Sequence, residues 1–437
     1  MRSHFKGLLL GGVAGAALVA SVGATLAGGV AIREQSALGM GVAFAGAAAG
    51  GAGLGSMFWN PATMTDFAGW QSSWSLSGII PNTKTTPNVA GTSPLLLATF
   101  GSASTGNMGQ SALVPGSYAS YQYNDNIWFG LAVTAPFGSS TTNPTNWAGA
   151  LYGQTSKLTT IDINPNVAYK FNDMFSLAFG LRIMYAELHY SSAASALVPN
   201  TTNIINADAW GVGFTAGMTF KPAPGTEIGI GYRSQVSEKL GGTFISPVGN
   251  SGMTSTIKAP DQITFGLKQR INDQWTVLAN VEWTHWSIFN TFPVYSTGGT
   301  IPAGTNFTNF AFRWSDGWFA SAGAEYKWNQ NWTIRAGAAY EWSPVTDTVR
   351  GVRIPDNDRV WLTAGASYQF SQKLSIDLSY AHIFVRNASI NINSANNPIF
   401  IAGVPFVGST KSNIDIVSVG LNYRWDEPVK GVVSAKY

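Results

Sequence analysis

The chain contains no cysteine among its 437 residues. This absence excludes a disulfide framework, a cysteine-ligated metal site and a catalytic thiol. It leaves the redox compartment open.

Charged residues are also scarce. Asp, Glu, Lys and Arg make up 11% of the chain, against about 25% in an ordinary soluble domain. The formal net charge is only +3, and no run of Lys or Arg resembles those that follow nucleic-acid phosphates. We therefore expect no nucleic-acid partner.

Long hydrophobic runs are missing beyond the N-terminus. No later stretch reaches the roughly 18 apolar residues that a spanning helix needs, which argues against a helical membrane protein. Residues 1–27 have a basic start, an apolar stretch rich in Gly and Ala, and small residues near its end. This pattern predicts a secretory signal peptide, cleaved after Ala24 or Ala27, rather than an N-terminal anchor.

What the chain does contain is alternation. In "DAWGVGFTAGMTF" (208–220), large apolar residues occupy every second position and Gly or Thr the positions between. Such a period of two indicates β-strands, but soluble sandwiches show it too. Aromatic residues at both ends of the apolar faces, such as Phe175 with Tyr185 and Trp332 with Trp342, favour the interfacial girdles of a transmembrane β-barrel.

Six short turns rich in Asn, Asp, Gly and Ser each join two alternating segments. They are Asn124-Asp125, Asn172-Asp173, 222–225, Asn272-Asp273, 329–331 and 371–373. With the first and last segments they give fourteen antiparallel strands over residues 69–425, an even number as in bacterial barrels. Short turns predict the periplasmic side, with both termini, and the long connections at about 81–111, 139–157, 191–207, 290–312 and 389–411 predict extracellular loops.

Residues 28–68 lack this alternation. Their run "GVAFAGAAAGGAGLG" (41–55) is too apolar for a solvated tail, so we expect the segment to pack as a hatch, or plug, inside the barrel lumen. Asn60 is a good helix N-cap and Pro61 suits the first helical position. The pair therefore predicts the start of a short helix in this segment.

Seven stretches of the chain resemble the outer-membrane long-chain fatty-acid transporter family, the FadL and TodX type that takes up hydrophobic compounds. They are "REQSALGMGVAFAG" (33–46), "NPA" (60–62), "TAPFG" (134–138), "NPNVAYKFND" (164–173), "GYRSQV" (231–236), "NWTIRAGAAYEWSPV" (331–345) and "RIPDNDRVWLTAGASYQF" (353–370). They span nearly the whole mature chain, and the first stretch combined with "IPDNDRVW" is specific.

The resemblance implies a fourteen-stranded barrel with an N-terminal hatch, in which Asn60, Pro61 and Ala62 form the hatch motif. It also implies that ligands pass from an external groove to a lumenal pocket and leave sideways, where the third strand is kinked. Pro136, Phe137 and Gly138 match that kink. Pro136 has no N–H and Gly138 weakens a strand, although a proline at the loop-facing end of a strand is also common.

Alternation places Arg182, Arg233 and Arg335 on the lumenal face, on the same side as Lys268, Glu282, Glu325 and Glu341. Either the arginines contact ligand, or these charges form an ion network that lines the lumen. Fatty-acid members of the family hold the carboxylate with basic side chains, and Glu187 stands where a basic residue is expected. Whether this chain binds acids is thus left open.

The resulting expectation is a monomeric, multi-pass channel of the bacterial outer membrane, in contact with membrane lipid and free of cofactors and metals. Its function would be passive, ligand-gated uptake of fatty acids or hydrocarbons by lateral diffusion. An enzyme is not expected, because His189, His285 and His382 sit in no nucleophile motif and no G-x-S-x-G elbow occurs. A general porin or an adhesin is the alternative. The tail 426–437 departs from the family pattern, and its role is open.

Overall fold

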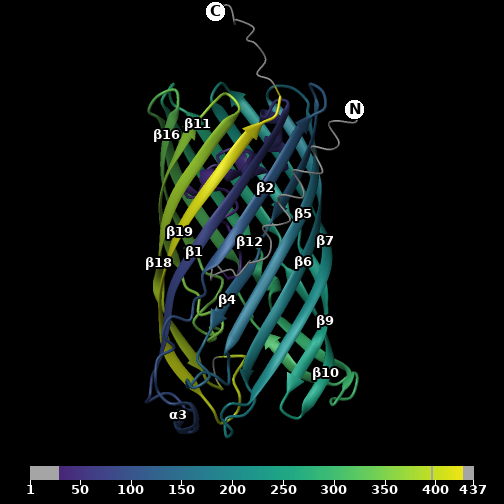
Figure 1. Cartoon of the computed structure of the whole chain (residues 1–437), viewed down its shortest axis with the longest axis vertical. Helices are drawn as coiled ribbons and strands as arrows, with labels where there is room; N and C mark the ends of the chain where they lie inside the picture. The colour runs from purple at the N-terminus through teal and green to yellow at the C-terminus, as the bar shows by residue number, and fades with distance from the viewer. Residues whose placement is uncertain (1–28, 395–396, 427–437) are drawn as a thin grey trace, which may run out of the picture.

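The computed structural model describes residues 29–394 and 397–426, which form a tall β-barrel (Figure 1). The predicted signal peptide (1–27) and all but the first residue of the tail 426–437 lie outside these described residues. No helix within them is long and apolar enough to cross a membrane.

Nineteen strand segments build a single sheet. They are β1 (Trp70–Pro87), β2 (Ala112–Gln122), β3 (Ile127–Thr134), β4 (Gly138–Thr142), β5 (Thr155–Lys170), β6 (Phe175–Ala193), β7 (Thr202–Ala223), β8 (Thr226–Arg233), β9 (Val236–Ser246), β10 (Gly249–Ala259), β11 (Gln262–Arg270), β12 (Trp275–Thr284), β13 (Thr291–Gly299), β14 (Asn306–Ala311), β15 (Gly317–Lys327), β16 (Trp332–Trp342), β17 (Arg359–Gln369), β18 (Leu374–Ile392) and β19 (Phe406–Arg424). The helices are α2 (Ala37–Met40), α3 (Pro94–Phe100) and the 3₁₀ helices η2 (Ala47–Ala49), η3 (Gly53–Phe58), η4 (Pro61–Asp66) and η5 (Trp286–Ile288).

Five pairs of consecutive segments continue one another across a short interruption, so that the barrel has fourteen antiparallel strands. These pairs are β3 with β4, β8 with β9, β10 with β11, β12 with β13, and β14 with β15. The sheet closes because β1 pairs with β19 on one side and β2 on the other. Because the barrel is closed, no sheet edge exposes unpaired backbone N–H and C=O groups to the bilayer. The predicted fold class, a barrel of fourteen strands, is confirmed.

The six predicted short turns all lie at one end, which we call the periplasmic end (top of Figure 1). Asn side chains shape four of them. In each, the Asn side-chain oxygen accepts hydrogen bonds from the backbone N–H groups two and three residues later, as at Asn124, Asn172, Asn272 and Asn329. This is the local bond through which Asn favours turns.

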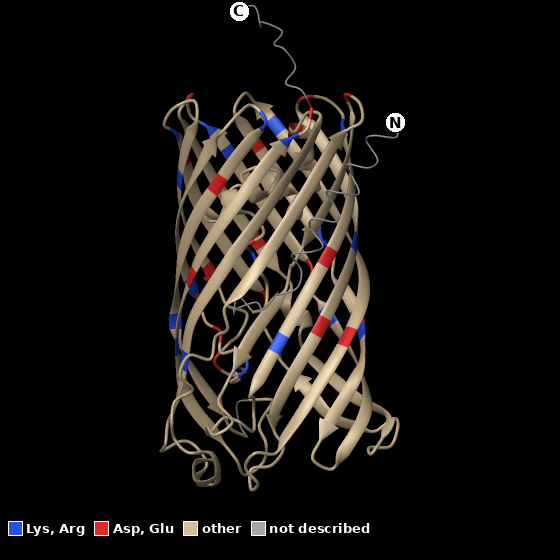
Figure 2. Cartoon of the chain, in the orientation of Figure 1, with Lys and Arg blue, Asp and Glu red and all other residues tan. Residues whose placement is uncertain are grey.

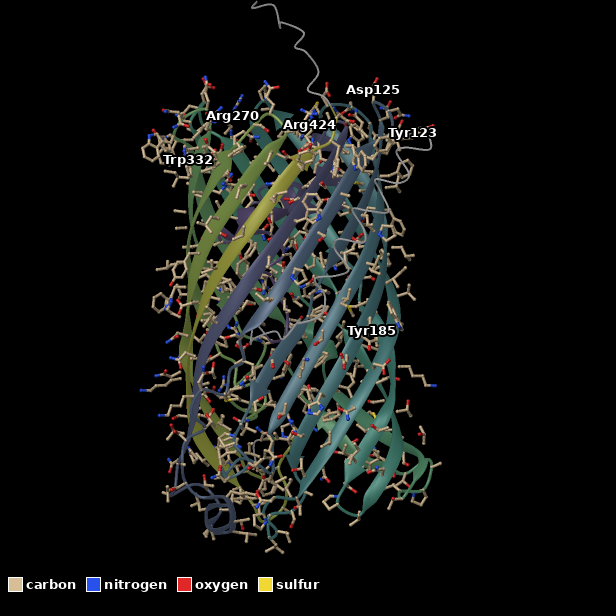
Figure 3. The ribbon with its side chains drawn as sticks, in the orientation of Figure 1. Tyr123, Asp125, Tyr185, Arg270, Trp332 and Arg424 are labelled. Carbon is tan, nitrogen blue, oxygen red and sulfur yellow. The ribbon has the colours of Figure 1, made fainter. Side chains whose placement is uncertain are left out.

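Charged residues are sparse along the strands between the two ends of the barrel (Figure 2). On β6, Leu177, Phe179 and Leu181 are exposed, whereas Arg182 is fully buried, which matches lipid-facing and lumen-facing alternation. Aromatic rings mark two levels on this wall. Tyr123 and Trp332 lie near the periplasmic end and Tyr185 much lower (Figure 3). The eleven residues from Phe175 to Tyr185 cover about 33 Å along the strand, which at a tilt of about 40° is a height of about 25 Å, that of an apolar band.

All five predicted loops are shorter than expected, because strands extend into each of them; at 389–411, for example, β18 runs to Ile392 and β19 begins at Phe406. The region 290–312 contains strands β13 and β14, and the strands on either side of 191–207 leave a loop of only 194–201. The barrel therefore continues beyond the aromatic level. At 81–111 the strand β1 runs to Pro87 and α3 occupies part of the connection. A long connection at 343–358 was not predicted.

The plug segment, residues 29–67, lies within the barrel (purple in Figure 1). Nearly all of it is buried, and Phe44, Phe58 and Trp59 form a common apolar cluster with the wall residues Phe319 and Trp361. Its polar contacts with the wall include two ion pairs. Arg33 pairs with Glu282 (2.9 Å) and Glu341 (2.6 Å), two carboxylates of the barrel.

Candidate functional site

The barrel wall is interrupted at Pro136, between β3 and β4. The β2–β3 ladder ends at the pair Ser117–Val133, and contact with the preceding chain resumes only at the bridge Gly109–Thr141. The two pairs have the same register, so β3 and β4 are parts of one strand. Over residues 134–139 this strand is not paired with the preceding chain. Pro136, Phe137 and Gly138 lie within this interruption.

The plug segment covers this interruption from inside. Ala31 forms an antiparallel bridge with Phe137. Around it, the Ile32 N–H donates to the Pro136 carbonyl (2.9 Å) and the Gly138 N–H donates to the Val30 carbonyl (2.8 Å). Backbone groups that lack a wall partner are thereby satisfied by the plug segment.

A glutamine completes this junction. The Gln35 side chain donates to the Ala135 carbonyl (2.8 Å), and the Gln35 carbonyl accepts from the Tyr118 hydroxyl (3.0 Å). Gln35 is fully buried and so ties both strands beside the gap to the plug segment.

An inner pocket lies next to the interruption. Its lining is Val30, Phe137, Leu158, Thr160, Met184, Glu238, Ile257, Ala259, Pro260, Trp286 and Phe289. Several of these residues come from breaks in barrel strands, where the chain leaves the wall and turns its side chains inward. The pocket is narrow, about 20 Å³ in volume, close to the space of one water molecule. A larger ligand enters only if rings such as Trp286 and Phe289 move.

Aromatic rings separate this pocket from a larger one near the extracellular end. Trp314 contacts both Trp286 (5.2 Å between centroids) and Phe289 (5.1 Å). On its other side Trp314 lines the outer pocket, about 470 Å³, together with Tyr152, Phe310, Phe312, Val345, Arg353 and Ile399. Trp314 thus belongs to the wall between a mixed polar and apolar outer pocket and an apolar inner one.

Arg353 is the cation of the outer pocket. Its guanidinium lies over the Tyr190 ring (5.0 Å) and donates to the Thr155 carbonyl and the Ser156 hydroxyl, both at 3.0 Å. Burial lowers the pKa of Arg353 to about 10, and no carboxylate among the described residues pairs with it. It therefore stays charged at neutral pH and can face a polar head of a ligand.

Arg182, Arg233 and Arg335 point into the lumen, but they line neither pocket. Arg182 and Arg233 both donate to Asp162 Oδ2 at 2.7 Å, and Arg335 pairs with Glu325 at 2.6 Å elsewhere in the barrel. Of the two interpretations drawn from the sequence, the geometry agrees with the ion network. It does not place these arginines where a ligand in either pocket would touch them.

Glu187 lies on the outer face of β6, exposed and directed away from the lumen. Its register partner on β7 is Asp208, which is also exposed. Glu187 therefore does not contact a ligand head group in the lumen. The acidic residue of the inner pocket is instead Glu238 on β9, which the sequence reasoning missed. The available signal was a single carboxylate between the inward-facing Val236 and Leu240.

Asn60 begins the helix η4, as expected for Asn-Pro-Ala at 60–62. Its Oδ1 accepts from the Ala62 N–H (3.0 Å), and its Nδ2 donates to the carbonyls of Ala48 (2.7 Å) and Met218 (2.8 Å). Asn60 therefore caps the helix, links two parts of the plug segment and joins it to β7. Pro61 and Ala62 are buried beside it.

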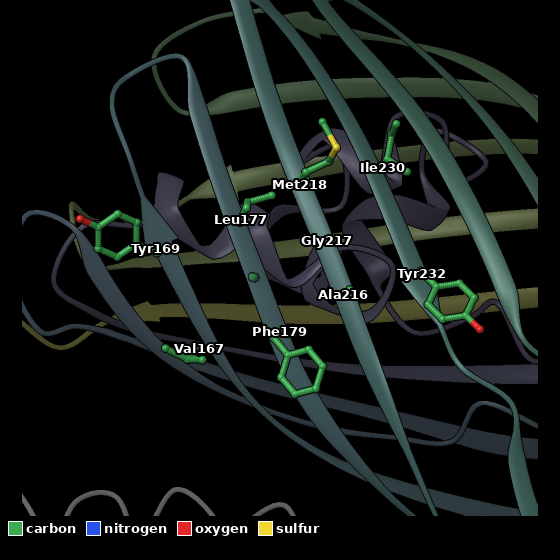
Figure 4. Close-up of a pocket in the computed structure, with 10 residues that line it drawn as sticks. Val167, Tyr169, Leu177, Phe179, Ala216, Gly217, Met218, Ile230 and Tyr232 are labelled. Atoms are coloured by element: carbon green, nitrogen blue, oxygen red, sulfur yellow. The ribbon is translucent and has the colours of Figure 1, made fainter.

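A further hollow, of about 550 Å³, lies on the outside of the wall between β5 and β8 (Figure 4). Tyr169, Phe179, Met218 and Tyr232 line it. These side chains belong to the lipid-facing surface, so the hollow is separate from the lumenal pockets.

Comparison with known proteins agrees with this architecture. The family model "Outer membrane protein transport protein (OMPP1/FadL/TodX)" matches residues 16–425. The long-chain fatty acid transport protein of Escherichia coli O6:H1 is 29% identical over 398 residues, 81% of this chain and 86% of that protein. A Pseudomonas aeruginosa FadL homologue has a similar fold, with a TM-score of 0.79 and 22% identity over 92% of this chain and all of that one. The Pseudomonas putida toluene transporter TodX also has a similar fold, with a TM-score of 0.64 and 16% identity over 89% of this chain and 100% of that one.

Proposed function

This chain belongs to the outer membrane transport protein family that includes FadL and TodX, and we propose that it takes up hydrophobic compounds, fatty acids or hydrocarbons, by passive lateral diffusion. A ligand enters the outer pocket, passes the aromatic wall to the inner pocket, and leaves through the interruption at 134–139 into the bilayer. The relatives' names, long-chain fatty acid and toluene transport, support this substrate range.

The observation that carries the proposal is the continuity of this path. Trp314 lines the outer pocket and touches Trp286 and Phe289 of the inner one. Phe137 lines the inner pocket and is itself part of the interrupted strand. An apolar ligand that follows these residues exposes little of its surface to water, which is the favourable course for a hydrophobic solute. No energy source is needed.

The plug segment serves as the hatch in this proposal. Its bridge at Ala31 covers the interruption, and Val30 lines the inner pocket. Because ligand and plug segment meet at Val30, a ligand in the pocket can bias the plug segment towards release from Phe137. The alternative, a general porin, needs an open aqueous lumen, whereas here the apolar segment 29–67 fills it.

A disulfide across the bridge tests the gate. Ala31 and Phe137 form a bridge whose hydrogen bonds lie on either side of the pair, so their Cα atoms are about 4.5 Å apart, within the range for disulfides. The chain has no other cysteine. In Ala31→Cys/Phe137→Cys, we expect uptake of a labelled fatty acid or hydrocarbon to stop on oxidation and to return on reduction.

The two single-cysteine variants are the controls for the loss of the Phe137 ring. Mass spectrometry confirms the disulfide, and heat-resistant migration on gels confirms the barrel. Equal uptake by the oxidised and reduced double variant would show that ligand leaves without opening this bridge, and the lateral route would have to be abandoned.

A further inference from the structure

Glu238 is the polar side chain of the inner pocket with an oxygen that has no partner among the described residues. It is 1% exposed, lines the pocket, and its Oε1 accepts no hydrogen bond from any described residue. The other polar residue of the lining, Thr160, is engaged: its hydroxyl donates to the Phe137 carbonyl (2.6 Å) and accepts from the Phe137 N–H (2.9 Å). A buried polar group without a partner is costly.

Nearby cations do not satisfy this carboxyl group. Arg182 donates to Asp162 and to the Ser234 carbonyl, and Arg233 donates to Asp162 and to the Phe58 carbonyl. Both guanidinium groups are thus fixed by other acceptors. Neither lines the inner pocket.

The wall is shaped to hold Glu238 in this place. A Cβ on Gly211 of β7 would lie 2.8 Å from Glu238 Cγ, so only a glycine lets the side chain lie across the neighbouring strand. On the other side, Glu238 is in register with Ile257 of β10, which also lines the pocket. The carboxyl group is therefore a fixed acceptor within an apolar lining.

We propose that the inner pocket favours hydrophobic compounds that carry an uncharged hydrogen-bond donor, such as long-chain alcohols or phenols, over free carboxylates, so that a fatty acid passes this pocket as the neutral acid. This inference rests on the proposed function and specifies its substrate class. A ligand hydroxyl satisfies Glu238 in either of its protonation states. A ligand carboxylate meets it favourably only if one of the two groups takes up a proton, because two unpaired negative charges in an apolar site repel strongly.

Matched ligands of one chain length test this proposal. Purified protein in detergent is dialysed to equilibrium against labelled decanol, decanoate or decane. We expect the wild-type protein to retain decanol about tenfold or more above decanoate, which corresponds to 1.4 kcal/mol or more. In Glu238→Gln, which keeps the shape and an acceptor oxygen, decanoate retention should rise and the preference should fall towards unity.

Three variants complete the design. Glu187→Gln makes the same substitution on the outer face and should leave the preference unchanged, whereas Glu238→Asp retains the carboxyl group and should keep decanoate excluded. Because Arg353 can hold an anion in the outer pocket, each measurement is repeated in Arg353→Gln to subtract decanoate bound there.

The outcomes separate the two proposals. Retention of all three compounds with no decanol preference, or a preference unaltered by Glu238→Gln, overturns the selectivity while uptake of hydrophobic compounds stands. Retention of none of them, decane included, overturns the proposed function itself. If Glu238→Gln fails to fold, the wild-type and Glu238→Asp preferences still decide, because the absence of a preference in both contradicts the inference.

Discussion

Gly231 of the barrel wall touches the backbone of Trp59 in the plug segment. A Cβ on Gly231 would lie 1.8 Å from the Trp59 carbonyl oxygen, and one on the neighbouring inward position, Gly229, would lie 1.8 Å from the Ala48 carbonyl oxygen. Both contacts are with backbone, which cannot move aside as a side chain can. The wall can therefore hold the plug segment closely only while these positions remain glycine.

Gly231→Ala should loosen the plug segment without dismantling the barrel. The added methyl group forces backbone apart, which costs about 1–3 kcal/mol, and the plug segment must shift because the ladder fixes β8. We expect higher ion conductance in planar bilayers and normal heat-resistant migration. Gly241→Ala is the control, since nothing lies within 4 Å of a Cβ there. Unchanged conductance in Gly231→Ala would mean that the plug segment does not limit the flow of small solutes.

Deletion of residues 28–68 extends this test. The segment fills the lumen with apolar backbone and side chains, so its loss should leave a barrel that is leaky to small polar solutes. Sugar-driven swelling of liposomes measures the leak. Liposomes that swell no faster than those with the full chain would contradict the assignment of this segment as the plug.

Asp162 should matter more to stability than any single arginine of the lumen. Its side chain is fully buried and forms ion pairs with two guanidinium groups, those of Arg182 and Arg233. Asp162→Asn leaves both without a counter-charge, and breaking a buried pair in this way costs about 3–5 kcal/mol. We expect urea unfolding in lipid vesicles, followed by tryptophan fluorescence, to shift to clearly lower urea.

The matched control is Glu325→Gln. Its ion pair with Arg335 is more accessible, with 18% of the Glu325 side chain exposed, so water can replace part of the interaction and the shift should be smaller. If both substitutions lower the midpoint equally, burial does not set the strength of these pairs.

The sequence predicted the membrane part of the fold because the bilayer imposes a simple code. Leu177, Phe179 and Leu181 face lipid and must be apolar, and Asn124 and its counterparts mark the turns through a local hydrogen bond. The region 291–311 follows another rule. Its strands lie beyond the apolar band, where the outer face contacts water. Ser, Thr and Gly can therefore occupy strand positions there, and the sequence resembles that of a loop.

The pockets could not be predicted because they arise where strands break. Pro136 gave a local signal, since it lacks a donor. The rings of Trp286 and Phe289 meet Phe137 only through the three-dimensional closure of the barrel, which no spacing in the chain reveals. The three arginines were placed correctly on the inner face, but alternation cannot tell that Asp162 holds two of them.

Pro136 and Gly138 should keep the exit through the wall open. If β3 ran straight into β4, the register would place Pro136 opposite Val114, yet this pairing is absent and the plug segment takes over the backbone bonds. Pro136→Val restores an N–H, and Gly138→Val stiffens the strand. The double variant should therefore favour a continuous β2–β3 ladder, narrow the exit and lower the uptake of a labelled fatty acid or hydrocarbon in cells.

Capture of ligand by the outer pocket should persist in this variant, because Trp314 and Arg353 are untouched. Pro165→Val is the control, because it also restores a backbone donor inside a strand. Its site lies away from the gap, and there the Asn164 side chain already donates a hydrogen bond to the Leu181 carbonyl (2.7 Å). Transport straight down the lumen into the periplasm would leave uptake unchanged in both variants. Wild-type uptake by Pro136→Val/Gly138→Val, present at normal levels, would thus rule out the lateral exit, because a ligand that leaves through the gap cannot be indifferent to its closure.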